Sequence, residues 1–379
     1  MLRTGKPRIC IVSPFEHGGG AEYQIGLLID ALASSGDYEV HYLAHFLDEQ
    51  PRDRAYSVRR IGSGGPMPRF GYLTEGRALY RMLREIDPCV IYQRVACGYT
   101  GVCAGYARRR AAPLVWHVSH DAELSPEPLD RARNVVRSRL ESWAVAYGIR
   151  HADRIIVQTR QQAQLLLKNY GRTAAAVVPN FHPPPPERID KQGPLTVIWI
   201  ANLKPWKQPQ LFVRLAERLR GCTDLRFIMV GAPAAAAGNE SWQRPLLEDI
   251  AAAPNLTFLG PKSQQEVNAL LAQAHIFVNT SLHEGFPNTF IQAWLRDVAV
   301  VSLRVDPDEV LQTRGAGILA RTEERLADAV RELRDPRVRM EFVRRGRDLA
   351  LERHSMRNAR QLIGLISGES GALAAHRGG

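Results

Sequence analysis

Short apolar segments alternate with helical segments along nearly the whole chain, and the alternation starts again after a run of prolines. A strand–helix–strand pattern of this kind favours parallel sheets that are covered by helices. The prolines at 183–186 cannot continue a helix or a central strand, so they divide the pattern into two halves. The predicted strands are 8–13, 39–44, 89–93, 114–117, 154–158 and 175–178 before the prolines, and 195–201, 225–230, 256–259, 276–279 and 298–303 after them.

The predicted architecture is α/β, with two nucleotide-binding-type domains in tandem. A chain of 379 residues is long enough for two domains that each have a core. Open α/β sheets bind ligands at the carboxyl ends of their strands, so we expect the site in a cleft between the two sheets. We predict an N-terminal domain at 1–182, a proline-rich linker at 183–194, a C-terminal domain at 195–366 and a disordered Gly/Ala/Ser-rich tail at 367–379.

Helix start and stop signals agree with this pattern. The first predicted helix ends near Gly36, where glycine allows the left-handed cap conformation. Pro209 stands in the first turn of a helix predicted at 208–220, where proline does not break a helix. Ser263 and Glu266 form a capping box that opens another helix.

The chain is basic, with 50 Lys and Arg against 39 Asp and Glu and a net charge of +11. A basic surface favours nucleotides, phosphosugars, anionic membranes or nucleic acids, without choosing among them. The arginine clusters at 108–110 and 344–345 are typical of solvated faces, and contact of a peripheral enzyme with anionic lipid is the alternative. No basic stripe with interleaved aromatic residues is present in the sequence, so we expect no nucleic-acid binding.

The sequence also predicts a compartment. No apolar run approaches the roughly 20 residues that a membrane helix needs, and 9–14 is too short for the core of a signal peptide. The five cysteines show no CxxC or Cys/His metal spacing. Cys10 and Cys89 lie in apolar runs typical of buried strands, which favours reduced thiols. We expect a soluble cytoplasmic protein, and leave peripheral attachment to the inner membrane face open.

The segment 280–294 is the most informative stretch for function. A predicted strand ends at Asn279, a loop carries Glu284, and a helix begins near Asn288. Unpaired backbone N–H groups at a helix start form an anion site. Glu284 beside that start can accept hydrogen bonds from sugar hydroxyls, so the segment combines an acid with a phosphate cradle.

A second segment, 201–209, also joins a strand end to a helix start. We expect its Lys204 and Lys207 to meet a diphosphate that is bound at the start of the helix near Asn288. A lone lysine near a helix start is most often only solvated, and a lone acid such as Glu284 is explained by the helix dipole. The loop context of Glu284 favours the functional interpretation, whereas for Lys207 that interpretation depends on the family resemblance described next.

Three motifs, spread over nearly the whole chain, carry a family resemblance. They are Gly-Gly-Gly-Ala-Glu at 18–22, Lys-Pro-Trp-Lys-Gln at 204–208 and Glu-Gly-Phe-Pro-Asn-Thr-Phe at 284–290. In this order they resemble the retaining glycosyltransferases of family 4. The resemblance implies the GT-B fold, in which two Rossmann-like domains with parallel sheets face a central cleft. It also implies an acceptor-side first domain, a second domain that holds a nucleotide diphosphate sugar, and no cofactor beyond that donor.

The resemblance implies roles for residues of the second half. Lys207 binds the donor diphosphate, and Glu284 binds hydroxyls of the donor sugar. The family's second acid, which normally contacts the nucleotide ribose, falls at a position where this chain has Gln292, and Asn202 stands where the family usually has an arginine. The backbone that helps to hold the diphosphate is that of Gly285, Phe286, Pro287 and Asn288.

In the first half, the resemblance implies that His120 faces the transferred sugar. His117 is the rival, but its place within a predicted strand favours a packed side chain. For His120 a hydrogen bond to nearby backbone is as good an interpretation as a functional role. Gly19 and Gly20 are assigned to the donor site as small residues that let a sugar approach the backbone. They are not a GxGxxG fingerprint, because Tyr23 stands at the third glycine position.

No motif places an enzymic nucleophile beneath the anomeric carbon of the sugar. The family is thought to work by same-face substitution, in which the departing diphosphate oxygen takes the acceptor's proton. The protein then has mainly to stabilise charge on the diphosphate, through Lys207 and the helix start, and to hold the two substrates together. Asp306-Pro-Asp308 spells a metal-binding D-x-D motif, but its proline predicts a turn, and we expect no metal requirement.

The leading hypothesis is therefore a retaining, metal-independent, hexosyltransferase-type enzyme that moves a sugar from a nucleotide diphosphate sugar to an acceptor hydroxyl. The acceptor is a carbohydrate, a glycoside or a lipid-linked glycan, in the biosynthesis of surface polysaccharides, glycolipids or glycosides. The alternatives are a nucleotide-sugar epimerase and, because of Asn202 and Gln292, a non-catalytic protein that binds a nucleotide sugar.

Overall fold

The computed structural model describes residues 5–16, 18–47, 54–62, 72–110, 112–125, 135–185, 191, 193–233 and 240–368. The chain divides into two compact units. Unit 1 comprises Met1–Phe181 together with Met356–Gly379, and unit 2 comprises His182–Ser355.

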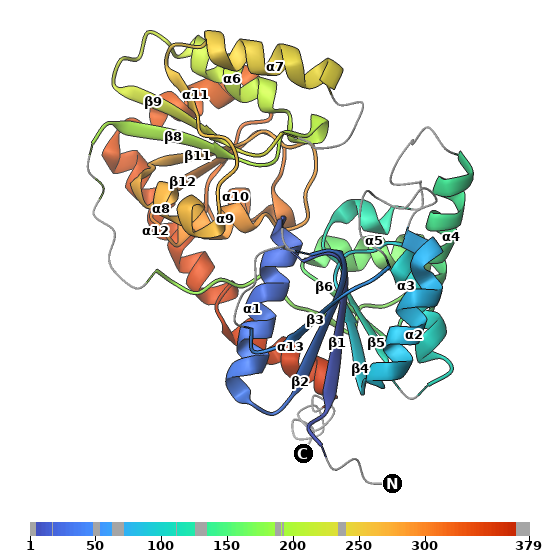
Figure 1. The fold of residues 1–379 in the computed structure, drawn as a ribbon. Helices are drawn as coiled ribbons and strands as arrows, with labels where there is room; N and C mark the ends of the chain where they lie inside the picture. Colours follow the sequence, from blue (N-terminus) through green and yellow to red (C-terminus); the bar gives the residue numbers. More distant parts are fainter. Residues whose placement is uncertain are drawn as a thin grey trace, which may run out of the picture. The chain divides into compact units, whose positions relative to one another are not determined.

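Unit 1 is built on a parallel sheet whose strands are β1 (Arg8–Phe15), β2 (Glu39–Phe46), β3 (Ser57–Arg60), β4 (Val90–Gln93), β5 (Leu114–His117), β6 (Arg154–Val157) and β7 (Ala176–Val177). Their order across the sheet is β3-β2-β1-β4-β5-β6-β7. Figure 1 labels β1 to β6 in this sheet. Strand β1 pairs in parallel with β2 on one side and with β4 on the other. Parallel strands need crossover connections, which the helices of this unit supply.

Helices cover both faces of the unit 1 sheet. They are α1 (Gly20–Ser35), α2 (Gly76–Ile86), α3 (Gly98–Ala107), α4 (Val135–His151), α5 (Arg160–Tyr170) and α13 (Arg357–Ser367), with the short 3-10 turns η1 (Tyr72–Glu75) and η2 (Asp121–Leu124). On one face Ile9 and Ile11 pack with α1 and α13, and on the other Cys10 and Val12 pack with α2, α3 and α4. Because successive residues of a strand point to opposite faces, β1 is a continuous apolar run.

Unit 2 has a second parallel sheet, made of β8 (Leu195–Ile200), β9 (Leu225–Val230), β10 (Leu256–Phe258), β11 (Ile276–Asn279), β12 (Ala299–Ser302) and β13 (Ile318–Leu319). Their order across the sheet is β10-β9-β8-β11-β12-β13. Strands β8 and β11 are far apart in the sequence but are neighbours in the sheet, with Val197 opposite Ile276. Both strands run in the same direction, so the loops that follow them leave the sheet at the same edge.

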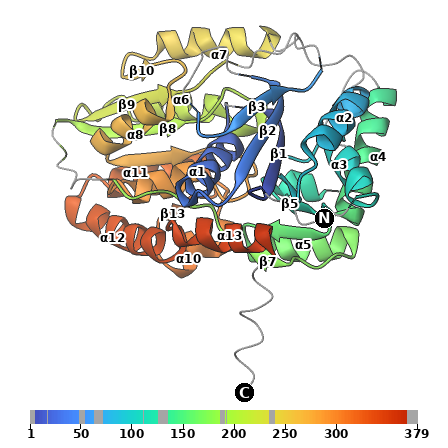
Figure 2. The same cartoon turned by 60° about the horizontal axis from the view of Figure 1, so that its bottom comes forward.

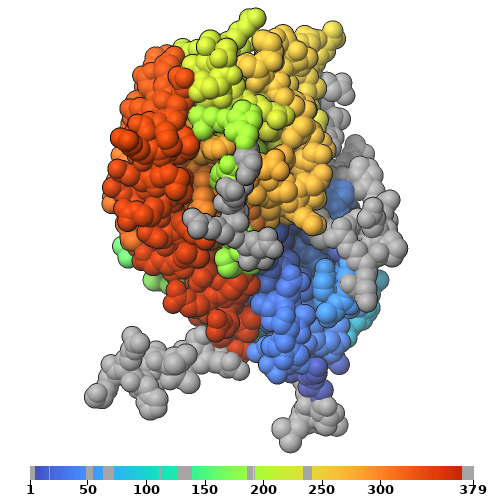
Figure 3. Space-filling model, turned by 90° about the vertical axis from the view of Figure 1, so that its left-hand side faces the viewer, coloured from blue at the N-terminus to red at the C-terminus, as the bar shows by residue number. Residues whose placement is uncertain are grey.

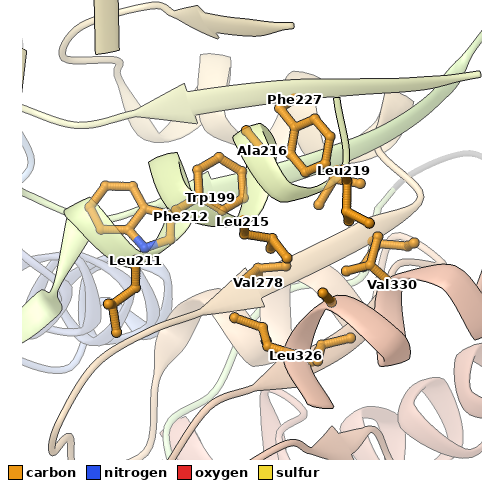
Figure 4. Packing of buried hydrophobic residues seen from close by; sticks show 14 of the residues in the cluster. Trp199, Leu211, Phe212, Leu215, Ala216, Leu219, Phe227, Val278, Leu326 and Val330 are labelled. Carbon is orange, nitrogen blue, oxygen red and sulfur yellow. The ribbon is translucent and has the colours of Figure 1, made fainter. Parts of the chain in front are cut away.

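The helices of unit 2 are α6 (Pro209–Arg218), α7 (Glu240–Ala252), α8 (Gln264–Gln273), α9 (Asn288–Trp294), α10 (Val310–Thr313), α11 (Glu323–Glu332) and α12 (Pro336–Arg353), with the 3-10 turns η3 (Pro205–Lys207) and η4 (Pro307–Glu309). On one face of the sheet, Trp199 belongs to a core that includes Phe212 of α6 and Leu326 of α11 (Figure 4). On the other face, Phe277 packs with α8 and α9. Helix α12 has exposed residues, and Figure 3 shows this part of the chain at the surface in orange-red.

The predicted α/β class, with two Rossmann-like parallel sheets, is confirmed. Each strand predicted from an apolar run is present, with its ends within two residues of the predicted bounds. Strands β3 and β13 are additional. The β3 sequence is Ser-Val-Arg-Arg and lies at the edge of the sheet, so it lacks the apolar run by which the other strands are recognised. The two residues of β13 are too few to form a pattern.

The predicted helix signals are also confirmed. Gly36 adopts the left-handed conformation, with φ 69°, and caps α1. Pro209 is the first residue of α6, which ends at Arg218 rather than at the predicted residue 220. In the capping box of α8, the Glu266 N–H donates to Ser263 Oγ at 3.2 Å and the Ser263 N–H donates to Glu266 Oε2 at 2.8 Å.

The last helix corrects the predicted domain at 195–366, because α13 belongs to unit 1 and not to unit 2. Its residues Ala359, Leu362 and Ile366 are buried in the same core as α1, beside which α13 lies (Figure 2). An amphipathic pattern shows that a helix has a buried face, but it does not show which sheet that face covers. The sequence therefore predicts the helix but assigns it to the wrong half of the chain.

The remaining domain predictions concern the linker at 183–194 and the tail at 367–379. Unit 2 begins at His182, so the predicted linker belongs to it. Residues 186–190 and 192 of the linker and 369–379 of the tail lie outside the described residues.

The five cysteines all lie within the described residues, and no disulfide joins them. Cys10 is buried in β1, as predicted, and burial raises the pKa of its thiol. Cys89 lies just before β4 and is half-buried, so its predicted place inside a buried strand is only partly correct. In the part of the chain that the structure describes, no helix has both the length and the apolarity to cross a membrane.

Gly231, which follows β9, allows a close approach of two backbone segments. A Cβ at this position would lie 1.9 Å from the carbonyl oxygen of Ala201. We expect Gly231→Ala to destabilise the protein by about 2 kcal/mol and to lower its melting midpoint by ~4 °C or more. Gly221→Ala is the matched control, because a Cβ there would have no neighbour within 4 Å. Equal melting midpoints for the two variants would contradict this account.

Candidate functional site

Lys207 and Glu284 meet in unit 2, although 77 positions separate them in the sequence. The Lys207 Nζ atom donates a hydrogen bond to Glu284 Oε1, and the two side chains form an ion pair. The exposed fractions of the side chains are 19% for Lys207 and 11% for Glu284. A largely desolvated pair of this kind interacts more strongly than a surface pair.

The sheet explains why these two residues meet. Lys207 ends η3, in the loop that follows β8, and Glu284 lies in the loop that follows β11. Strands β8 and β11 are adjacent and parallel, so both loops leave the same edge. The candidate site therefore lies at the carboxyl edge of the unit 2 sheet.

Hydrogen bonds also join the two loops that carry Lys207 and Glu284. Thr280 Oγ1 donates to the carbonyl oxygen of Lys207 at 2.6 Å and accepts from Trp199 Nε1 at 2.9 Å. The N–H of Leu282 donates to the carbonyl oxygen of Trp206 at 2.8 Å. Backbone and buried side chains thus hold the loops at two successive peptide units, 206 and 207.

A serine orients the carboxylate of Glu284. Ser281 Oγ donates to Glu284 Oε1 at 2.7 Å, which is the same oxygen that meets Lys207. The Ser281 N–H is itself held by Asn279 Oδ1 at 3.1 Å. Ser281 and Lys207 therefore both restrict the direction in which the carboxylate points.

Asn288 begins α9, as the sequence predicts, and its side chain is held from outside that helix. His182 Nε2 lies 3.0 Å from Asn288 Oδ1, and the His182 N–H donates to the carbonyl oxygen of His354 at 2.9 Å. Burial lowers the pKa of His182 to about 3, so its ring is neutral and Nε2–H is the donor. Phe286 packs against His354, with ring centroids 4.3 Å apart.

Gln292 lies four residues into α9 and is buried. Its side-chain nitrogen donates to Gln264 Oε1 at 3.1 Å and to Asn268 Oδ1 at 2.9 Å, both on α8. These bonds use both N–H groups of the Gln292 amide, so a ligand hydroxyl would have to donate to the amide oxygen. Nothing in the spacing of the sequence predicts these contacts with α8.

The loop before η3 carries two further candidates. Lys204 holds its ammonium over the ring of Trp206, 5.1 Å from the ring centre, which is a cation–π contact. Asn202 follows β8 and is half-buried, next to the bridge between Leu203 and Pro233.

The first-domain histidines belong to unit 1. His120 caps η2, and its Nδ1 accepts from the N–H of Ala122 at 3.0 Å, which is the backbone interaction weighed for it from the sequence. His117 is fully buried, as predicted, with Nδ1 2.9 Å from the Tyr92 hydroxyl and 3.2 Å from Arg94 Nη1. Burial, and then the charge of Arg94, lowers the pKa of His117 well below its usual value.

Two buried charged residues of unit 1 do not stand out in the sequence. Arg94 follows β4, is buried, and donates through Nη2 to Asn180 Oδ1. Burial raises the pKa of Glu123 to about 7, although N–H groups of Ser119 and Ala96, 2.9 and 3.4 Å away, oppose the shift. Arg94 directly follows β4, whereas Glu123 lies in η2, beyond the end of β5.

Gly19 and Gly20 lie at the start of α1. Gly19 is its N-cap residue, and a Cβ there would lie 2.6 Å from Glu22 Oε2. A larger residue at 19 would therefore displace the Glu22 carboxylate.

Asp306 and Asp308 form a turn, as predicted. The Asp306 carboxylate accepts from the N–H of Leu311 at 2.7 Å and from Gln312 Nε2 at 3.1 Å, and Asp308 lies within η4. Among the described residues, no group of three or more His, Cys, Asp or Glu is arranged to hold a metal ion.

Family models match both halves of the chain. The model of Glycosyltransferase Family 4 matches residues 18–184, and the model of Glycosyl transferases group 1 matches residues 194–335. A D-inositol 3-phosphate glycosyltransferase from Mycobacteroides abscessus is 29% identical over 62% of this chain and 56% of that protein. The chain thus spans just over half the length of this curated relative.

Solved structures share the fold. Sucrose-phosphate synthase from Thermosynechococcus elongatus matches with a TM-score of 0.77 at 16% identity, over 97% of this chain and 100% of that chain. HepE from Anabaena, solved with UDP and glucose, matches with a TM-score of 0.72 at 19% identity, over 96% of this chain and 100% of that chain. At these identities the likeness establishes the GT-B fold alone. The two family models, and not these structures, show that the chain is a glycosyltransferase, with a Glycosyltransferase Family 4 domain in its first half and a Glycosyl transferases group 1 domain in its second half.

Proposed function

We propose that this glycosyltransferase transfers a sugar from a nucleotide diphosphate sugar to an acceptor hydroxyl with retention of the anomeric configuration. The observation that carries the proposal is the Lys207–Glu284 pair at the carboxyl edge of the unit 2 sheet. A cation and a carboxylate side by side provide what a sugar diphosphate needs, since one meets phosphate oxygens and the other accepts sugar hydroxyls.

In this proposal Lys207 stabilises the negative charge that grows on the leaving diphosphate. A preorganised cation is most effective when it lies in a site with little water, as the low exposure of the pair provides. Before the donor binds, Glu284 balances the charge of Lys207, so neither charge is left buried alone. When the diphosphate arrives, it competes with the carboxylate for the ammonium group, and the carboxylate turns to the sugar hydroxyls.

The same proposal extends to the chemical course of the reaction. The acceptor oxygen forms a bond with the anomeric carbon on the face from which the diphosphate leaves, and the acceptor's proton passes to a diphosphate oxygen. The protein needs no nucleophile and no metal for this step, and its main tasks are charge stabilisation and substrate positioning. His120, Gly19 and Gly20 are proposed to contact the sugar from unit 1.

UDP-sugars are the first donors to test, because HepE, which shares the fold, was solved with UDP and glucose. The acceptor is proposed to be a carbohydrate, a glycoside or a lipid-linked glycan of a surface polysaccharide or glycolipid pathway. The M. abscessus relative is named for a phosphorylated cyclitol, so polar polyols belong in the acceptor screen.

The test is a panel of nucleotide sugars, first by thermal shift and then by release of nucleoside diphosphate with and without acceptors. A donor that binds only the folded protein raises the melting temperature. We expect one donor to raise the melting temperature and to be hydrolysed slowly when no acceptor is present. With an acceptor, the new linkage should have the same anomeric configuration, α or β, as the donor sugar. An inverted product, or activity abolished by EDTA and restored by a divalent ion, would overturn the retaining or metal-independent part.

The two alternatives give different results in the same assay. An epimerase converts the donor sugar without any acceptor, and a binding-only protein raises its melting temperature with a donor but never releases nucleoside diphosphate. Gln292 is the residue that favours the second alternative, because its amide is held by α8 and carries no charge.

Gln292 gives a prediction that separates binding from catalysis. We expect Gln292→Ala to raise the donor KM several-fold with little change in kcat, since a ribose contact is made in the ground and transition states alike. Gln292→Glu should fold and bind the donor at least as well. Its carboxylate would face Gln264 Oε1 and Asn268 Oδ1, and both amides can turn their N–H groups toward it.

Gln273→Ala is the matched control, because Gln273 is exposed at the other end of α8. Donor kinetics and melting curves of the wild type and the three variants provide the measurement. A fall in kcat with an unchanged KM in Gln292→Ala would contradict a ribose contact. Restoration of activity to an inactive wild type by Gln292→Glu would establish the binding-only alternative.

A further inference from the structure

We propose that Thr280 is a positioning residue that holds Lys207 against Glu284, an inference that rests on the proposed function of this pair. Thr280 is the first residue after β11 and is fully buried. Its hydroxyl is shared between Trp199 on β8 and the backbone of Lys207. Neither of these two hydrogen bonds involves the ammonium group of Lys207 or the carboxylate of Glu284. Thr280 would therefore act on Lys207 through its backbone.

The hydroxyl is used in both of its hydrogen-bonding capacities. It accepts from Trp199 Nε1 at 2.9 Å and donates its own proton to the carbonyl oxygen of Lys207 at 2.6 Å. A hydroxyl group can donate and accept at the same oxygen, whereas an apolar side chain can do neither. Trp199 is buried to the same degree, so its indole N–H depends on a protein partner.

The bond to the Lys207 carbonyl falls at a constrained point of the chain. Lys207 closes the 3-10 turn η3, and its N–H donates back to the Lys204 carbonyl at 2.9 Å. The next residue, Gln208, has φ 48°, a left-handed conformation that costs a non-glycine residue energy. Such a conformation persists when surrounding contacts fix it, and the Thr280 bond fixes the peptide between 207 and 208.

A second bond between the loops lets the role of Thr280 be tested without unfolding the site. The Leu282 N–H donates to the Trp206 carbonyl without involving the Thr280 hydroxyl, so we expect this bond to remain in a variant that lacks the hydroxyl. The loops would then stay associated, while the Lys207 peptide would gain freedom to rotate. A side chain on a rotating peptide spends less time at the place where the leaving diphosphate develops charge.

Thr280→Val is the informative variant, because valine keeps the shape of threonine and removes the hydroxyl. We expect it to lower kcat about tenfold or more, since small displacements of a positioned charge are costly in the transition state. The Kd for the free nucleoside diphosphate should change less than threefold, because the flexible ammonium still reaches a bound phosphate. Thr280→Ser restores the hydroxyl and should keep kcat within threefold of the wild type.

Thr196→Val is the matched control for loss of a buried hydroxyl. Thr196 lies at the opposite end of β8 and donates to the Pro194 carbonyl at 3.0 Å. We expect Thr196→Val to lower the melting temperature less than Thr280→Val does, because its partner carbonyl belongs to the exposed Pro194, and to leave kcat unchanged. The proposal is overturned if Thr280→Val has wild-type kcat, if Thr280→Ser is as impaired as Thr280→Val, or if the control loses kcat equally.

A second measurement keeps the positioning role separate from the proposed function. Acetylation of Lys207 by an amine-reactive ester, followed by peptide mass spectrometry, reports how well the ammonium is held by Glu284 and needs no substrate. We expect several-fold faster modification in Thr280→Val than in the wild type and in Thr280→Ser. If the wild type proves inactive with every donor while this difference is found, the proposed function fails and the positioning role stands. Equal modification rates would overturn the positioning role itself.

Discussion

Replacing Lys207 with alanine is expected to lower kcat/KM about 100-fold or more, because a charge-assisted contact with the leaving diphosphate is lost. The ion pair with Glu284 shows that the ammonium already points into the carboxyl edge of the sheet. The same change leaves the Glu284 carboxylate without its cation in a site of low exposure. The negative charge of this carboxylate then repels an incoming diphosphate. Both consequences act in the same direction, so the loss should be larger than that from most single changes of unit 2.

Lys262→Ala is the matched control for this variant. Lys262 also pairs with a glutamate, Glu266, but at 3.2 Å and on an exposed helix start. Surface pairs contribute little, so we expect kcat/KM within twofold of the wild type. The measurement is steady-state kinetics at varied donor concentration, with circular dichroism to check folding. Near-normal turnover of a folded Lys207→Ala enzyme would remove Lys207 from the proposed mechanism.

The fold could be predicted in large part because its strands are buried on both faces. Such strands appear in the sequence as unbroken apolar runs, as in β1, and turn residues such as Gly36 bound them. The exceptions lack that signal. Strand β3 carries two arginines at a sheet edge, and α13 has an apolar face whose partner lies more than 300 residues earlier in the chain.

The candidate site could be predicted only at its charged centre. Lys207 and Glu284 stand in motifs at strand ends, and the sheet brings them together as the strand pattern implies. Ser281 orients Glu284 from three residues away, but the other contacts that hold the site join residues far apart in the sequence, which no local spacing encodes. Examples are the bond from Trp199 to Thr280 and the bond from His182 to Asn288. Their polar atoms become visible as partners only when burial and distance are known.

Glu284→Gln tests the other half of the pair, and its effect should fall on transfer rather than on nucleotide binding. The carboxylate oxygen Oε1 now accepts from Lys207 Nζ and from Ser281 Oγ. A glutamine keeps the shape and one acceptor oxygen, but a neutral acceptor forms hydrogen bonds about half as strong. We expect transfer to fall about 100-fold, because the weakened bonds to sugar hydroxyls are those that orient the anomeric carbon.

Nucleotide affinity should respond in the opposite direction. In the wild type the diphosphate must compete with the Glu284 carboxylate for Lys207, and a neutral amide competes less. We therefore expect the free nucleoside diphosphate to bind Glu284→Gln as tightly as the wild type or more tightly, by calorimetry. Glu248→Gln, which loses an exposed pair with Arg244, is the control and should change neither quantity. If nucleotide affinity collapsed together with transfer, Glu284 would be a structural residue or a nucleotide ligand, since a residue that meets only the sugar cannot weaken the binding of a ligand without sugar.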